Sequence, residues 1–398
     1  MKKIYSLLML CILCGASLTQ AQTVNQNLWV TNGQVNATVV VGNTAYIGGS
    51  FTEVGAASGQ GVVLDTIIGN RDAAFPKVAG SVNAVVSDGN GGWIIGGDFN
   101  AVGGLTRNGL ARIKSDKNVD TMWNPNVNGP LYALLTSGNT IYAGGAFSMV
   151  NGNVMRNNLA AFNLTTGTAS SWNPNANGWV NGLVVSGNTI FVGGNFNVVN
   201  GSIGRNYLAA FDITTGTATS WNPNVNGGVN VLAVSGSTVY AGGAFTMVNG
   251  STTRNNLASF DITTGNATEW NPNVNSSVRT LAVSGSTIYA GGSFTSVNGN
   301  IVRNRLAAFN STNGTTRAWN PNVGGFSFTL VNTLAVSGGT VYAGGDFTFV
   351  NGSSTRNRLA AFDLTTGIVT AWNPNANGDV YLWRHQIALY LLEECSLL

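Results

Sequence analysis

The sequence predicts an all-β protein, a β-propeller of four-stranded antiparallel blades with seven blades in this chain. A module of ~49 residues recurs seven times, as repeat architectures require. Glycine is abundant, at 53 of 398 residues, which is typical of many short strands joined by tight turns. No stretch of the repeat region shows a sustained helical period.

The first glycine of a Gly-Gly-x-Phe motif marks the register of each module. The motif begins at Gly48, Gly96, Gly144, Gly193, Gly242, Gly291 and Gly344. A module of this size cannot cover both faces of its own sheet, so neighbouring modules must pack against each other. A radial arrangement achieves this and leaves only short edges. A linear β-solenoid is the alternative, although its coils are usually shorter, about 20–30 residues.

Each module divides into four expected strands. In one module these are Val229–Val234, Thr238–Ala241, Asn256–Asp261 and Ala267–Trp270. Ser-Gly-Ser, the glycine pair and Thr-Thr-Gly separate them, and Pro272 ends the last strand because it cannot donate to a ladder. Large apolar side chains on these strands are expected to pack between blades.

The ends of the chain differ from the repeats. Residues 1–21 have a basic start, an apolar run from Ile4 to Leu13 and small residues up to Ala21, which predicts a secretory signal peptide. A short membrane anchor is the alternative. We therefore expect a secreted or cell-surface protein, with the seven-repeat propeller at residues 25–381 and no membrane span. The segment around Trp29 resembles a fourth strand, and we expect it to pair into the last blade.

Residues 382–398 form an anomalous tail. Codons for these residues, read one base out of frame, can encode Leu-Ala-Ala-Ser followed by Gly-Gly-x-Phe-Thr, in register with Leu334 to Thr348. Our hypothesis is that a lost nucleotide truncated an eighth repeat. Eight blades are then possible in an undamaged parent. The alternative is a natural C-terminal helix.

Composition excludes several kinds of chemistry. Cys11 and Cys14 lie in the predicted signal peptide, and Cys395 and the single histidine, His385, lie in the tail. The repeat region therefore holds no Ser-His-Asp triad, Cys-His pair or histidine-ligated zinc. A net charge of +3 with 8% charged residues is too small and dispersed to indicate nucleic acid binding.

The recurring Asn-Pro-Asn-Val-Asn-Gly segment, such as residues 222–227, has the spacing of a calcium loop. Its side chains are neutral amides, and Ala233 stands at the twelfth position, where such a loop needs a bidentate glutamate. A turn with asparagine at positive φ is the better interpretation. We expect no metal and no cofactor.

Two motifs carry a family resemblance. Residues 210–216, Ala-Phe-Asp-Ile-Thr-Thr-Gly, followed by Trp221, resemble the docking pattern of quinoprotein-like propellers. The fuller string, from Tyr-Ala-Gly-Gly-x-Phe to Trp-Asn-Pro-Asn, resembles the delta-60-type repeats, uncharacterised β-propellers of secreted and surface bacterial proteins. The resemblance implies the fold. It does not imply quinoprotein catalysis, because the repeat body has no cysteine and only two glutamates, Glu53 and Glu269.

Two sets of side chains recur as structural blade motifs. The tryptophans are expected to pack between blades: Trp123, Trp172, Trp221, Trp270, Trp319 and Trp372. The arginines are expected to stack on aromatic rings or bind loop carbonyls, the alternative being a ring of cations for an anionic ligand: Arg107, Arg156, Arg205, Arg254, Arg303 and Arg356.

Candidate ligand-binding residues lie where the repeat is broken. Trp179, Arg279, Phe326 and Phe328 are bulky residues on loops where other modules carry small ones, and loops of this kind bind ligands or partners. The alternative is that they plug the central channel or pack locally.

Asp98 and Asp346 vary the third place of Gly-Gly-x-Phe. Neither has a second carboxylate at fixed spacing, so nothing indicates acid–base catalysis. We expect a solvated or loop-bonding aspartate at each position.

The sequence therefore predicts a non-catalytic, monomeric propeller that serves as a binding, adhesion or scaffold module for an unknown protein or glycan. It does not predict an enzyme. Two alternatives stay open: a hydrolase or lyase that uses surface aspartates, and a purely structural surface repeat.

Overall fold

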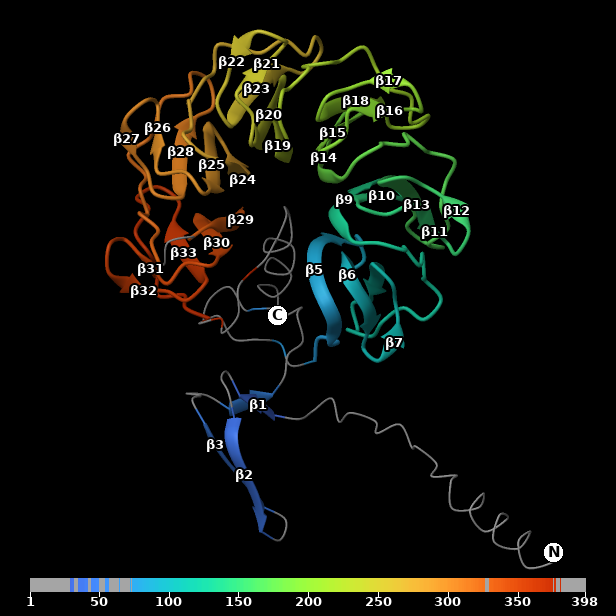
Figure 1. Ribbon diagram of the computed structural model, residues 1–398, viewed down its shortest axis with the longest axis vertical. Helices are drawn as coiled ribbons and strands as arrows, with labels where there is room; N and C mark the ends of the chain where they lie inside the picture. Colours follow the sequence, from blue (N-terminus) through green and yellow to red (C-terminus); the bar gives the residue numbers. More distant parts are fainter. Residues whose placement is uncertain are drawn as a thin grey trace, which may run out of the picture. The chain divides into compact units, whose positions relative to one another are not determined.

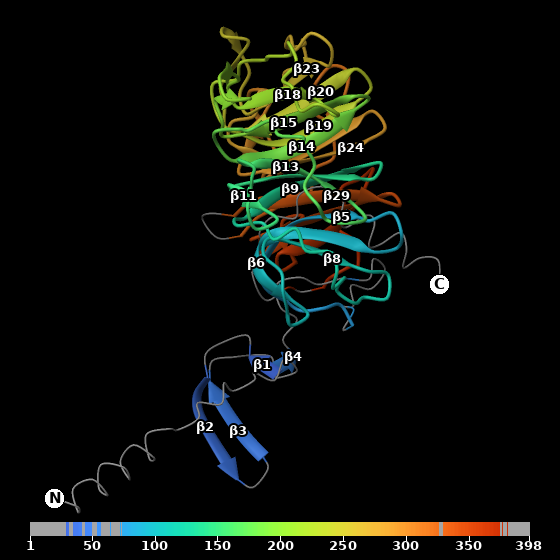
Figure 2. The ribbon, with the colours of Figure 1, turned by 90° about the vertical axis from the view of Figure 1, so that its right-hand side faces the viewer.

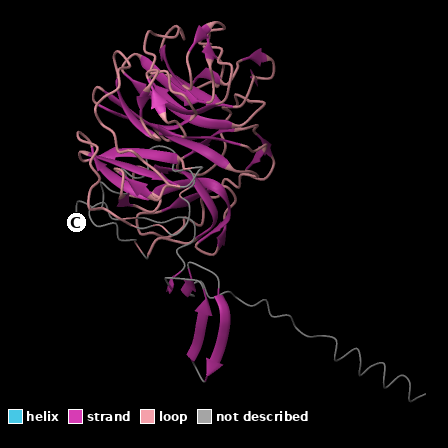
Figure 3. Ribbon diagram, turned by 60° about the vertical axis from the view of Figure 1, so that its left-hand side comes forward, coloured by secondary structure: helices cyan, strands magenta, loops and turns pink. Residues whose placement is uncertain are grey.

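The computed structural model describes residues 29–31, 35–41, 44–49, 54–56, 64, 72, 74–325, 329–374, 376 and 380. None of these residues is helical, so the described residues contain no membrane-spanning helix. The strands recur throughout (Figure 3), which confirms the all-β prediction for the part of the chain that is described. The chain forms two compact units, residues 1–57 and 58–398.

The N-terminal unit contains two short antiparallel pairs. Strand β2 (Val35–Val41) pairs with β3 (Thr44–Gly49), and β1 (Trp29–Thr31) pairs with β4 (Val54–Ala56). The expected pairing of the Trp29 segment into the last blade stays a prediction, and in the described residues β1 has β4 as its partner. This partner is close in sequence, so little chain entropy is lost in closing the loop.

The described residues of the second unit form six antiparallel sheets of three or four strands, numbered first to sixth along the chain (Figure 1). The first sheet contains β5 (Val78–Ser87), β6 (Trp93–Val102), β7 (Leu105–Thr106) and β8 (Leu110–Ile113). The second contains β9 (Leu131–Ser137), β10 (Thr140–Gly145) and β13 (Leu159–Asn163). The third contains β14 (Val180–Ser186), β15 (Thr189–Gly194) and β18 (Leu208–Asp212).

The last three sheets repeat this plan. The fourth sheet contains β19 (Val229–Ser235), β20 (Thr238–Gly243) and β23 (Leu257–Asp261). The fifth contains β24 (Val278–Ser284), β25 (Thr287–Gly292) and β28 (Leu306–Asn310). The sixth contains β29 (Val331–Ser337), β30 (Thr340–Gly345) and β33 (Leu359–Asp363).

In the second to sixth sheets, a two-stranded ribbon follows the second strand. The ribbons are β11 (Met149–Val150) with β12 (Val154–Met155), β16 (Val198–Val199) with β17 (Ile203–Gly204), β21 (Met247–Val248) with β22 (Thr252–Thr253), β26 (Ser296–Val297) with β27 (Ile301–Val302), and β31 (Phe349–Val350) with β32 (Ser354–Thr355). The sequence did not predict these ribbons.

The six sheets lie side by side around a common centre, and their first strands, β5, β9, β14, β19, β24 and β29, face that centre (Figures 1 and 2). Apolar clusters fill the spaces between neighbouring sheets, as with Trp221 and Val229 between the third and fourth. This is the radial packing of a β-propeller.

The predicted fourth strand is shorter than expected. In the fourth sheet it is reduced to one bridge, Phe260 to Ala267, flanked by hydrogen bonds from Asp261 N to Asn266 O and from Thr268 N to Ser259 O, both 2.9 Å. The chain then leaves the sheet, because Trp270 docks on the next sheet.

The glycine pair is required by two close approaches. A Cβ on Gly243 would lie 2.1 Å from the carbonyl oxygen of Gly228 within the same sheet, and one on Gly242 would lie 2.6 Å from Val278 of the next sheet. A β-bulge in the first strand, between Val229 and Val231, brings these chains together. The motif that marks the repeat is therefore a packing motif.

The bulge residue itself links neighbouring sheets. Asn230 Nδ2 donates to Val278 O at 3.0 Å. The same bond is made by Asn83 to Leu131 O, by Asn181 to Val229 O and by Asn332 to Val380 O. These amides fasten the first strands to each other around the centre.

All six predicted tryptophans are buried, and Trp123, Trp172, Trp221, Trp270 and Trp319 each pack on the sheet that follows. Trp221 is 3% exposed, and its Nε1 donates to Asp261 O of the next sheet at 3.0 Å. Its ring lies edge-on to Phe191 and Phe260, with centroids 4.9 and 6.0 Å away. Burial of such a ring contributes about 4–6 kcal/mol, so the tryptophans are a major part of the contact between sheets.

A tyrosine reinforces this contact. Tyr240 Oη donates to Ser311 O of the next sheet at 2.9 Å, and the ring lies edge-on to Trp270 at 5.0 Å. Burial raises the pKa of Tyr240 above its usual value. The hydroxyl therefore stays protonated and keeps its donor role.

The predicted arginines bind loop carbonyls, not a ligand site. Arg254 donates from Nη1 to Thr253 O at 2.8 Å and from Nη2 to Thr268 O at 2.7 Å. Corresponding bonds are made by Arg107, Arg156, Arg205, Arg303 and Arg356. Each guanidinium joins the start of the third strand to the segment after it.

Candidate functional site

Two loops of each module meet at one end of the sheets, which we call the loop face. One loop is the Asn-Pro-Asn-x-Asn segment that leads into a first strand, and the other joins the second strand to the third. In the fourth sheet Asn226 Oδ1 accepts from the backbone N–H groups of Thr246 and Met247, both at 2.9 Å. We call this arrangement the asparagine clamp.

The predicted turn conformation of the Asn-Pro-Asn-x-Asn segment is confirmed. Its second asparagine has positive φ in every described copy, at Asn126, Asn175, Asn224, Asn273 and Asn322. Each of these side chains accepts a hydrogen bond from an asparagine that precedes the third strand, such as Asn206 Nδ2 to Asn224 Oδ1 at 2.8 Å. The segment is therefore a rigid turn held by amides.

The structure places two of the predicted ligand-binding residues. Trp179 is 56% exposed and directly precedes β14. Arg279 is exposed on the bulge of β24, where its Nη1 lies 3.2 Å from Asn332 Oδ1. They belong to the third and fifth sheets, so they do not form one compact site. Phe326 and Phe328 lie outside the described residues.

A hollow of about 460 Å³ opens on the loop face between the first and second sheets. Both loop types contribute to it. Its lining consists of Ala79, Gly80, Gly97, Asp98, Phe99, Asn100, Asn108, Gly109, Val127, Asn128 and Gly129. Such a volume is in the range of small-molecule binding sites.

The asparagine that fills this place in the second to fifth sheets is missing at residue 79. Ala79 pairs with Ala101 on β6. In the second sheet Asn128 holds the corresponding place, and its N–H donates to Met149 O. The first sheet therefore has alanine where the asparagine clamp would be.

A second side chain is missing at residue 109. Gly109 has φ +69°, and the corresponding Asn158 and Asn256 have φ +63° and +61°. Asn256 donates from Nδ2 to Val274 O. A Cβ on Gly109 would approach Gly129 O and Val127, two lining residues, at 3.0 and 3.2 Å. The hollow thus results from two substitutions away from the repeat.

Asp98 brings a carboxylate to this hollow. Its side chain is exposed and makes no hydrogen bond or ion pair with the residues that the structure describes. At the same place in the sixth sheet, Asp346 Oδ1 accepts from Leu330 N. The expectation of a solvated or loop-bonding aspartate is therefore met in both ways, with Asp98 exposed and Asp346 bonded to a loop.

The other polar groups of the hollow are amides. Asn108 donates from Nδ2 to Asn126 Oδ1 at 2.8 Å, and Asn128 Oδ1 accepts from Ser148 N and Met149 N, both at 3.0 Å. Asn100 is exposed. Asp98 is the sole charged residue of the lining, so the hollow combines one negative charge with neutral donors and acceptors.

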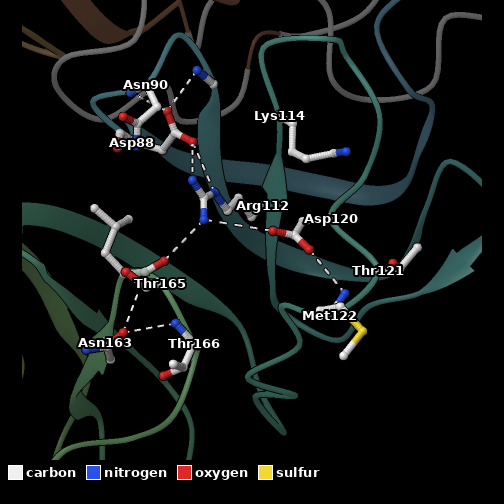
Figure 4. Close-up of polar contacts among 12 residues, drawn as sticks. Asp88, Asn90, Arg112, Lys114, Asp120, Thr121, Met122, Asn163, Thr165 and Thr166 are labelled. Carbon is white, nitrogen blue, oxygen red and sulfur yellow. Dashed lines mark hydrogen bonds and ion pairs between the residues drawn. The ribbon is translucent and has the colours of Figure 1, made fainter.

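Two other carboxylates lie at the opposite end of the first sheet, around Arg112 (Figure 4). Asp88 is 2% exposed, and its Oδ2 lies 2.8 Å from Arg112 Nη2. Its Oδ1 accepts from the N–H groups of Asn90 and Gly92, both at 2.8 Å. Asp120 Oδ2 lies 3.8 Å from Arg112 Nη1. These carboxylates therefore hold Arg112 and the turn after β5 in place, which is a structural role.

Within the described ranges, no group of three or more His, Cys, Asp or Glu side chains could hold a metal ion. The sequence singled out Asp98 but did not predict the hollow. The signal that could have revealed the hollow is the presence of Ala79 and Gly109 at positions where other modules have asparagine.

The fold defines a β-propeller with an open hollow on its loop face. Two family models match the chain: the one described as outer membrane protein assembly factor BamB matches residues 157–320 and 208–374, and the one described as a domain of unknown function (DUF5122) beta-propeller matches residues 89–121. The chain belongs to the quinoprotein-like β-propellers.

One solved structure supports the propeller fold. The crystal structure of the computationally designed Ika8 protein is similar with a TM-score of 0.54 and 15% identity, over 91% of this chain and 92% of that chain. The designed Ika4 protein has a TM-score of 0.32 and 14% identity, over 47% of this chain and 92% of that chain. No curated protein matches.

Proposed function

We propose that this protein is an exported, non-catalytic β-propeller that binds a protein or a glycan through its loop face. The observation that carries the proposal is the hollow between the first and second sheets, where the repeat has lost two side chains and gained the exposed carboxylate of Asp98. The exposed indole of Trp179, on the loop before the third sheet, offers a second contact.

The arrangement of carboxylates favours binding over hydrolysis. Hydrolysis of a glycosidic bond typically uses two carboxyl groups that flank that bond. The hollow has one. Asp88 and Asp120 come together around Arg112 instead, and Asp88 is buried with both oxygens already accepting hydrogen bonds. We therefore favour a binding protein over a hydrolase or lyase as the function.

The finer assignments belong to the same proposal. We interpret the modules as delta-60-type repeats, the unit count as seven blades and residues 1–21 as a signal peptide that directs the protein to the exterior or the cell surface. Residues 1–21 and the tail at 382–398 lie outside the described residues. The name of one matched family, an assembly factor, also supports a role exercised on a partner.

A binding screen with paired variants tests the proposal. The full chain is applied to a glycan array and to purified cell-surface proteins, and each ligand found is measured again with Asp98→Asn, Trp179→Ala and the control Asp116→Asn. Asp116 lies in an exposed turn at the opposite end of the first sheet, so its variant removes the same charge elsewhere.

We expect at least one loop-face variant to weaken binding tenfold or more, with the control unchanged. Absence of any ligand, or equal binding by all three variants, would contradict the proposal and favour a purely structural repeat.

A further inference from the structure

We infer that the hollow between the first and second sheets is a subsite for a neutral carbohydrate, with the Asp98 carboxylate accepting hydrogen bonds from sugar hydroxyls. This inference rests on the proposed binding function and names the ligand class of one site on the loop face.

The chemistry of the lining matches that of vicinal hydroxyl groups. A hydroxyl both donates and accepts, so its site needs acceptors and donors side by side. The Asp98 carboxylate provides strong acceptors, and the amide of Asn100 provides both kinds of group. Asn108 uses its Nδ2 for Asn126, which leaves its Oδ1 as a further acceptor in the part of the chain described.

The charge of the hollow determines which sugars fit. Its lining holds the Asp98 carboxylate and no cation. The nearby Arg107 donates to the carbonyls of Thr106, Asp120 and Thr121. A sialic or uronic acid would bring a second negative charge without a partner, so neutral sugars are favoured.

The lining offers little apolar surface against which a large side chain of a partner protein could be buried. Hot spots of protein interfaces are large side chains in desolvated pockets. The apolar lining residues Phe99 and Val127 are 6% and 1% exposed, so their side chains already belong to the core. A lysine or arginine of a partner could still pair with Asp98, and a cationic peptide is therefore included in the test.

The repeat itself provides a variant that should close the hollow without disturbing the fold. Ala79→Asn restores the residue of the asparagine clamp, and Gly109→Asn restores the residue that Asn158 and Asn256 provide at nearly the same φ. Asparagine tolerates this left-handed conformation better than most residues. The double variant is the refilled variant, and we expect it to unfold at or above the temperature of the parent chain.

The experiment measures binding of the full chain to an array of neutral mono- and oligosaccharides and to an immobilised tetralysine peptide. Four proteins are compared: the parent chain, the refilled variant, Asp98→Asn and the charge control Asp116→Asn. We expect the parent and the control to bind a neutral sugar, and the other two to lose at least tenfold in affinity.

Equal sugar binding by the refilled variant would overturn the inference, as would binding of tetralysine in place of sugars. In the first case, loss of binding in Trp179→Ala would still support the proposed function at another part of the loop face. If the parent chain binds no sugar, peptide or surface protein, both the inference and the proposed function fail.

Discussion

The first and fourth sheets share a backbone plan but differ at both ends. Both have the bulged first strand and the glycine pair. On the loop face the fourth sheet has the asparagine clamp of Asn226, and the first has Ala79 and a hollow. Side chains at this end are therefore free to change while the glycines hold the chain.

The opposite ends differ in how they join the next sheet. Tyr240 stands two residues before Gly242 and donates to Ser311 O. Ile94 holds that place in the first sheet, and Arg112, its partner across the ladder, donates instead to Leu164 O at 3.4 Å. Leu164 holds the place of Ser311 in the repeat. An ion-paired arginine therefore donates the hydrogen bond to the next sheet that a tyrosine donates in the fourth sheet. The same contact between sheets is thus reached by different chemistry.

The largest effect is expected from Asp88→Asn. This change leaves the guanidinium of Arg112, whose side chain is 15% exposed, without its buried partner. Breaking a buried pair in this way costs about 3–5 kcal/mol, and urea unfolding would measure it. Adding Arg112→Ala removes the orphaned charge, so the double variant should cost less than the sum of the single changes. If the losses of unfolding free energy from the two single changes simply add in the double variant, the Asp88–Arg112 pair does not stabilise this end of the sheet.

A smaller effect separates the tryptophans of the two sheets. Trp221 Nε1 donates to Asp261 O, whereas the buried Nε1 of Trp123 has no hydrogen-bond partner among the described residues. Trp221→Phe should therefore cost about 1 kcal/mol more than Trp123→Phe, the net value of one hydrogen bond. Equal losses in urea unfolding would mean that the indole bond adds nothing to the contact.

The clamp and the hollow should respond in opposite directions. Asn226→Ala removes the acceptor for two backbone N–H groups, and we expect a loss of about 1 kcal/mol. Ala79→Asn supplies the missing clamp and should leave stability equal or raise it by up to about 1 kcal/mol. Thermal unfolding of both variants checks the pair. A clear loss for Ala79→Asn would show that the first sheet cannot accept the repeat residue.

The smallest expected effect concerns pH. Hydrogen bonds from the backbone N–H of Thr215 and then from its side chain lower the pKa of Asp212 below the usual 3.8, and the corresponding turns lower the pKa of Asp261 and Asp363. The folded state therefore binds these protons less readily. Their contribution to stability is present above pH 3.8 and is lost as the pH falls through the lowered values.

Asparagine offers a control for this effect. Asn310 holds the same turn in the fifth sheet, accepting from Thr312 N. Replacing Asp212, Asp261 and Asp363 by Asn should keep the turns and flatten the fall in melting temperature between pH 5 and 2. An unchanged pH profile would contradict this assignment.

The fold could be predicted because its determinants repeat. The glycine pair, the docking tryptophan and the arginine have similar contacts in successive sheets, although Trp123 makes no indole hydrogen bond to the described residues, so one module describes the others closely. The fourth strand could not be placed as well, because Trp270 leaves its own sheet to pack on the next. The ribbons after the second strands lack any apolar alternation long enough to indicate a strand.

The candidate site was harder to predict for a physical reason. Added groups are visible in a sequence: Trp179 and Arg279 were predicted to bind a ligand, and Asp98 was noted without being assigned to a site. The hollow depends on groups that are absent, at Ala79 and Gly109, and on the structural equivalence of these residues with Asn128 and Asn158. That equivalence follows from register and backbone conformation.

Hydrogen–deuterium exchange of the full chain, with and without the neutral sugar that binds most tightly, tests the central claim most directly. Our account predicts that the sugar slows exchange at residues 97–109 and 127–129, the two segments around the hollow, and leaves the equivalent segments 243–256 and 274–276 unchanged. Equal protection of the two regions, or protection confined to residues away from the first sheet, would contradict it.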